Sequence, residues 1–142
     1  MKLRTLMVVN AFVAGLFGIA FAIIPGQSLS QYGFTADPAL ELMFQLLGAA
    51  FIGFGVLTWA ARNATDSEAR RAILLALFVG DFIGFVITLV AQLSGFVNSL
   101  GWSSVAIYLL LALGWGYFRF LKPAETATVK AVTPEATPDA DF

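Results

Sequence analysis

The sequence contains no cysteine and no histidine, and only 12% of its 142 residues are charged. Without cysteine there is no disulfide, thiol relay or thiolate metal site, and without histidine there is no imidazole base or ordinary haem ligand. Four-helix thiol–quinone oxidoreductases are therefore excluded. The acids other than Asp81 lie in predicted loops and near the C-terminus, so no pair of carboxylates is placed for hydrolysis. We expect no enzyme activity, no metal, no cofactor and no nucleic-acid partner.

Apolar residues, in contrast, make up 59% of the chain. They are concentrated in four runs, each near the roughly 20 residues that a helix needs to cross a bilayer. The runs cover residues 6–24, 42–60, 72–93 and 102–120. Backbone groups in lipid must be hydrogen-bonded within the protein, and the runs lack strand-like alternation, so helices are expected. The sequence predicts an all-α polytopic membrane protein, with residues 1–122 forming an antiparallel bundle of four transmembrane helices in the lipid bilayer.

The first run also has features of a signal peptide. Lys2 and Arg4 precede it, and Ala20-Phe21-Ala22 resembles a cleavage site. The apolar stretch is longer than the roughly 7 to 15 residues of a signal-peptide core. We therefore expect this run to be retained as a transmembrane helix.

The basic residues predict the orientation of the bundle. If the chain starts in the cytoplasm, all eight of them fall on the cytoplasmic side. We expect a multi-pass protein of the inner membrane with both termini in the cytoplasm, and the asymmetry argues against insertion in two orientations. The basic residues are Lys2, Arg4, Arg62, Arg70, Arg71, Arg119, Lys122 and Lys130.

Turn and capping signals lie between the runs. Thr65-Asp66-Ser67-Glu68 is a capping-box sequence that predicts the start of the third helix before the membrane. Pro25-Gly26 is expected to end the first helix, and Asp37-Pro38 to start the second. The external segment between them carries three residues that would either cover the mouth of the bundle or lie on the bilayer surface: Leu29, Tyr32 and Phe34.

The composition changes at residue 123. Residues 123–142 are rich in proline, alanine, threonine and acidic residues and have no apolar periodicity. Such a segment cannot bury enough apolar surface to offset the entropy lost on ordering. We predict a disordered, solvated cytoplasmic tail.

Small residues recur at four-residue spacing on three of the predicted helices. In lipid, such residues allow close approach between helix backbones. The spacing predicts packing of helices within the bundle, although a homo-oligomer or a membrane-protein partner would use the same faces. The residues concerned are Ala11, Gly15, Gly18 and Ala22 on the first predicted helix, Gly48, Ala49, Gly53 and Gly55 on the second, and Ala72, Ala76, Gly80 and Gly84 on the third.

Asp81 is the only acid within the four apolar runs, and the one base in them, Arg119, lies at the very end of the fourth run. A charged side chain at the centre of a bilayer costs roughly 2.5 to 3.5 kcal/mol on insertion scales, so it normally faces the bundle interior and has a partner. At 100° per residue, Asp81, Thr88 and Gln92 share one face of the third helix. The predicted donors facing this polar stripe are Tyr108, Trp115 and Asn10.

Three roles for Asp81 follow from this placement. It is a neutral or hydrogen-bonded structural carboxyl, a proton or cation relay that uses Thr88 and Gln92, or part of a site for a small lipid-soluble ligand or quinone between the third and fourth helices. The sequence favours the structural role. An Asp81→Asn substitution distinguishes the relay from the structural role.

Three features resemble small four-helix bacterial membrane proteins of the DoxX-like group: the order of the four spans, the external loop at residues 32–37, and the glycine-rich segment that runs from residues 47–50 to residues 53–57. The resemblance covers roughly residues 5 to 122 and implies an accessory role beside a quinone-linked oxidoreductase. No catalytic residue is carried over to this sequence. The favoured function is a structural or accessory membrane subunit without catalysis, and the alternative is a small proton-coupled transporter or channel that uses Asp81.

Overall fold

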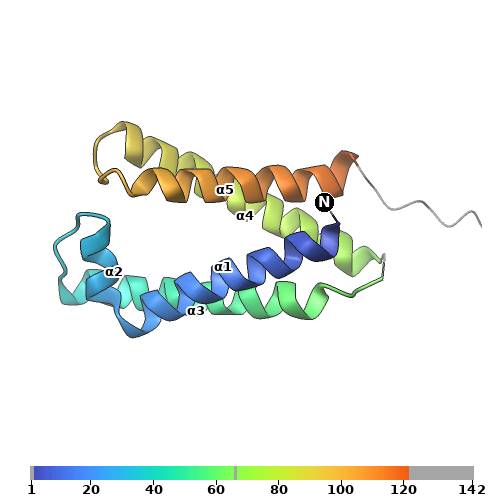
Figure 1. Cartoon of the computed structure of the whole chain (residues 1–142), viewed down its shortest axis with the longest axis horizontal. Helices are drawn as coiled ribbons and strands as arrows, with labels where there is room; N and C mark the ends of the chain where they lie inside the picture. The colour runs from blue at the N-terminus through green and yellow to red at the C-terminus, as the bar shows by residue number, and fades with distance from the viewer. Residues whose placement is uncertain (1, 66, 122–142) are drawn as a thin grey trace, which may run out of the picture.

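The computed structural model describes residues 2–65 and 67–121, all of whose regular structure is helical (Figure 1). Four helices are long and apolar enough to cross a membrane, as predicted. The predicted disordered tail, residues 123–142, lies outside the described residues. The elements are α1 (Leu3–Ile23), α2 (Pro25–Gln31), α3 (Pro38–Ala61), α4 (Glu68–Leu93), α5 (Gly101–Gly116) and the π-helix η1 (Tyr117–Leu121), which continues α5.

The four long helices form two antiparallel hairpins. Helix α1 packs along α3, with the short α2 between them in the chain, and α4 packs along α5 (Figure 1). The two hairpins lie apart over much of their length and meet mainly at their ends. The predicted bundle is therefore a pair of hairpins rather than four evenly packed helices.

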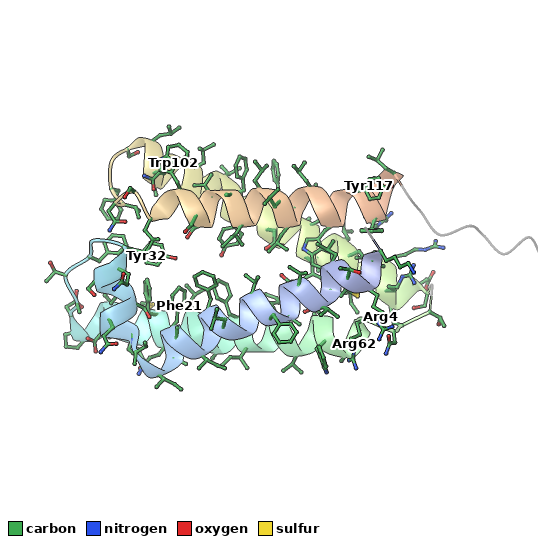
Figure 2. All side chains as sticks on the ribbon, viewed as in Figure 1. Arg4, Phe21, Tyr32, Arg62, Trp102 and Tyr117 are labelled. Carbon is green, nitrogen blue, oxygen red and sulfur yellow. The ribbon has the colours of Figure 1, made fainter. Side chains whose placement is uncertain are left out.

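At one end, which we call the basic end, the hairpins share a core. Arg4 and Arg62 mark this end in Figure 2. The core joins side chains from all four long helices and from η1, so it holds the two hairpins together there. Its buried members are Leu6, Met7, Ala61, Leu74, Leu77, Trp115 and Phe118.

At the opposite end, which we call the α2 end, polar contacts join the hairpins. The Tyr32 hydroxyl lies 3.1 Å from the Ser104 hydroxyl, and the Asn98 side-chain amide donates to the Gln31 carbonyl at 2.7 Å. The Phe34 and Phe96 rings lie 5.4 Å apart between centroids. Tyr32 and Phe34 therefore cover the mouth of the bundle, one of the two placements that the sequence left open.

The segment between α1 and α3 is more ordered than an irregular loop. Pro25 ends α1 and opens α2, where its missing N–H leaves no hydrogen bond unmade. Leu29 in α2 is fully buried, and the Ser28 hydroxyl donates to the Ala20 carbonyl at 3.3 Å. Helix α2 thus packs inward, which the polar composition of the segment had concealed.

The predicted start of α3 is confirmed, and that of α4 is corrected. The Asp37 carboxylate accepts from the backbone N–H groups of Ala39 and Leu40, at 2.9 and 3.0 Å. In α4 the N-cap is Ser67, whose hydroxyl accepts from the Arg70 N–H at 3.2 Å. Because Glu68 is the first helical residue, it cannot close a capping box with Thr65.

Candidate functional site

A cavity of about 450 Å³ lies between the two hairpins, bounded by the joined ends. Residues of α1 and α3 form one wall and residues of α4 and α5 the other. Five phenylalanine rings from α1 and α3 line it: Phe17, Phe21, Phe44, Phe51 and Phe54. Figure 2 shows Phe21 directed from α1 toward the space between the hairpins.

Asp81 lines this cavity from the middle of α4. The indole Nε1 of Trp115 donates a hydrogen bond to its Oδ2 at 2.8 Å. Trp115 is fully buried in the core at the basic end, so its indole is held in place by packing. The other carboxylate oxygen, Oδ1, has no hydrogen-bond partner among the described residues.

Of the predicted donors to Asp81, Trp115 makes the contact and the other two do not. The Asn10 amide donates to the Thr58 hydroxyl of α3 at 3.2 Å, and both side chains are buried. Tyr108 also lines the cavity, but its ring lies beside Gly84, in the space that a Cβ on this glycine would occupy. Sequence reasoning missed Thr58 as the partner of Asn10, although a threonine within an apolar run was the available signal.

The predicted polar stripe on α4 faces the cavity. Thr88 and Gln92 both line it, on the side of Asp81 toward the α2 end. The Thr88 hydroxyl donates to the Gly84 carbonyl of its own helix at 2.8 Å, so this proton is already used. The Gln92 Oε1 is buried and has no hydrogen-bond partner in the described part of the chain, and the side-chain amide nitrogen makes one long contact, 3.5 Å, to the Val97 carbonyl.

Three of the predicted packing glycines lie where α1 and α3 meet: Gly15, Gly18 and Gly48. A Cβ on Gly18 would lie 2.8 Å from the Ile52 backbone nitrogen, and one on Gly48 would lie 2.6 Å from the Ala22 nitrogen. Gly15 lies against α3 through its backbone, 3.3 Å from a Cβ built on Gly55. These contacts let α1 and α3 approach closely.

In the second hairpin, Gly84 has the same role. A Cβ there would lie 2.5 Å from the Tyr108 ring, so the glycine makes room for the tyrosine. A Cβ on Gly53 or Gly80 would meet nothing within 4 Å among the described residues; the same holds for Gly15, but Gly15 itself lies against Gly55 of α3. Within the described residues, Gly53 and Gly80 therefore pack against no neighbouring helix, which leaves open the alternative that they face a second copy or a partner.

The chain matches no protein-family model, no curated protein and no solved structure. The resemblance to DoxX-like proteins is therefore not supported beyond the shared arrangement of four apolar helices. The protein is a small polytopic membrane protein whose helices contact the lipid bilayer, with a largely apolar cavity between two hairpins.

Proposed function

We propose that the protein binds a small, largely apolar molecule within the membrane, in the cavity between its two hairpins. The observation that carries this proposal is a cavity of about 450 Å³ lined by phenylalanine rings and a single carboxyl group, Asp81. Small-molecule sites typically have volumes of roughly 300 to 1,000 Å³, mostly apolar walls and a few polar groups that orient the ligand. We propose a binding role rather than a catalytic one.

The packing within each hairpin supports this proposal. The glycines of α1 and α3 bring those helices into close contact, and Gly84 does the same for α4 and α5. Such packing makes each hairpin a rigid wall, because interdigitated interiors deform little. A cavity between two rigid walls is preformed, so less free energy is lost in organising it when a ligand binds.

A cavity-filling substitution tests the proposal. Gly80 lines the cavity, and a Cβ there meets nothing, so Gly80→Leu is expected to fill part of the cavity without disturbing the fold. Photolysis of the neutral apolar probe 3-trifluoromethyl-3-phenyldiazirine should label Asp81 and Tyr108 in the wild type. We expect Gly80→Leu to remove most of this labelling, as measured by peptide mass spectrometry.

The matched control is Gly53→Leu, on the outer surface of α3, where a Cβ also meets nothing. It should leave the labelling of Asp81 and Tyr108 unchanged. Phe12 and Leu16, 68% and 71% exposed on α1, should be labelled equally in all three proteins, because they report contact with lipid. Equal cavity labelling in Gly80→Leu and the wild type would contradict the proposal.

We further propose that the basic end lies in the cytoplasm of a cell whose inner membrane holds the protein. The reason is the positive-inside rule, applied to the arginines at that end. Because the natural chain has no cysteine, single substitutions report the topology without background. A membrane-impermeant maleimide should label Ser99→Cys in intact cells and Asn63→Cys only after permeabilisation; the opposite pattern would contradict this orientation.

An accessory subunit is the second candidate function, and the open surface at Gly53 favours it. Gly53 lies on the surface of α3 in a row of small and apolar residues, and a Cβ there would meet no atom of the described residues within 4 Å. A partner helix would bring its backbone close to this glycine. A membrane protein that co-purifies in a fixed ratio with the wild type, but not with Gly53→Leu, would support this role.

The proton-coupled transporter is the alternative reading of the same cavity. Asp81, Thr88 and Gln92 all line it, as that mechanism requires. The Thr88 hydroxyl is bonded to its own helix, however, so its proton is not offered to Asp81. The ligand-binding proposal needs no proton path and is therefore preferred. Proton-driven uptake by vesicles that Asp81→Asn abolishes would instead favour the transporter.

A further inference from the structure

The charges that line the cavity point to the kind of ligand it binds. Among the described residues, the lining contains the carboxyl group of Asp81 and no lysine or arginine. The remaining polar groups are hydroxyls and amides, such as Thr88 and Gln92. An anionic ligand would place like charges together at low dielectric, which is strongly unfavourable.

The described residues supply a hydrogen bond to only one oxygen of the Asp81 carboxyl group. Trp115 donates to Oδ2 at 2.8 Å, and it is fixed by the core at the basic end. Oδ1 has no hydrogen-bond partner among the described residues. A buried or half-buried carboxylate within a membrane is normally paired with a cation or with several donors. Because Asp81 lines the cavity, a ligand bound there can supply this partner.

The opposite wall of the cavity suits a positive charge as well as an apolar body. Five phenylalanines of α1 and α3 line it, and four of them form a cluster, in which the Phe17 ring lies 5.8 Å from that of Phe21 between centroids. The Phe21 ring lies 4.9 Å from that of Phe44 and 5.9 Å from that of Phe51, between centroids. Aromatic faces attract cations that have been removed from water. Neither wall therefore opposes a cation.

We infer that the ligand is a lipophilic monovalent cation, whose charge lies beside Asp81 Oδ1 and whose apolar body lies against the phenylalanine wall. This inference rests on the proposed function, because it names the ligand class of the same cavity. A cation of this kind supplies the opposite charge that the cavity lacks. It also exposes little polar surface to the rest of the lining.

Binding of two ions of similar size and shape but opposite charge tests the inference. Tetraphenylphosphonium and tetraphenylborate would be compared by equilibrium dialysis on the full-length protein in phosphatidylcholine nanodiscs, with empty nanodiscs as the partition background. We expect saturable binding of tetraphenylphosphonium and no binding of tetraphenylborate above background. Phenyltrimethylammonium, a smaller cation, would be measured in parallel so that a poor fit in size is not mistaken for a lack of cation binding.

Asp81→Asn is the decisive variant. The asparagine carbonyl can still accept the Trp115 hydrogen bond, so the fold should be retained while the charge is lost. We expect its affinity for tetraphenylphosphonium to fall by about tenfold or more, since a hydrogen bond or contact to a charged group is worth this much. Asp37→Asn is the matched control, because it removes one acid outside the cavity and preserves a helix cap.

The outcomes separate this inference from the proposed function. Equal affinity of Asp81→Asn and the wild type, equal binding of the two ions of opposite charge, or no binding of either cation would overturn the inference. In each case, neutral-probe labelling that Gly80→Leu blocks would leave the proposed function standing. Labelling that Gly80→Leu does not block would overturn the proposed function.

Discussion

Replacing Gly48 with alanine is expected to destabilise the protein by about 2 to 3 kcal/mol, a cost typical of severe overpacking. The new Cβ would lie 2.6 Å from the backbone nitrogen of Ala22 and 2.7 Å from the carbonyl oxygen of Gly18. Backbone atoms cannot rotate away as a side chain can. Helices α1 and α3 would therefore have to separate along their main contact.

Gly53→Ala, five positions further along α3, is the matched control. A Cβ there meets nothing, so the substitution should stabilise the protein by roughly 0.5 to 1 kcal/mol through helix propensity alone. Reversible unfolding in mixed detergent and sodium dodecyl sulfate micelles, followed by circular dichroism, would measure both values. If both substitutions changed the free energy of unfolding in the same direction, this result would contradict the close approach of α1 and α3.

Replacing Trp115 with alanine is expected to have the largest effect on stability, about 3 to 5 kcal/mol, as for other large buried aromatic residues. Trp115 is fully buried in the core that holds the two hairpins together at the basic end. Its loss would also remove the hydrogen bond to Asp81. The same unfolding measurement applies, and Trp102→Ala, at a side chain 49% exposed on α5, should cost far less.

A double-mutant cycle isolates the hydrogen bond from the packing. Trp115→Phe and Asp81→Asn would be measured alone and together. Interhelical hydrogen bonds in membranes couple by roughly 0.6 to 1.7 kcal/mol, so Trp115→Phe should show its larger cost where the partner is aspartate. Equal costs in the two backgrounds would indicate that Trp115 acts through packing only, and that Asp81 is positioned by something else.

The transmembrane architecture could be read from the sequence. Apolar runs of sufficient length give the four spans, because the thickness of the bilayer sets the length of a helix that crosses it. The cap at Asp37 was also predictable, since it depends on residues within one turn. The start of α4 was misplaced from Ser67 to Thr65, because two neighbouring hydroxyl residues offer the same local signal.

The candidate site could be predicted only in part. Asp81 was identifiable because an acid in an apolar span is costly, and Thr88 and Gln92, which helical geometry places on the same face, line the same cavity. The choice of Trp115 over Tyr108 and Asn10 as its partner was not predictable. It depends on the rotation of each helix about its axis, which no local pattern specifies.

The division of the helices into two hairpins, and the cavity between them, were decided by tertiary packing. In lipid, an apolar face is as stable against acyl chains as against another helix, so the apolar pattern specifies insertion without specifying contacts. Which glycines pack is then decided by backbone fit: a Cβ on Gly48 would meet α1, whereas one on Gly53 or Gly80 would meet no described atom within 4 Å. Length and hydropathy thus predict the four spans of this protein, and the close fit of their surfaces places Asp81 beside an apolar cavity.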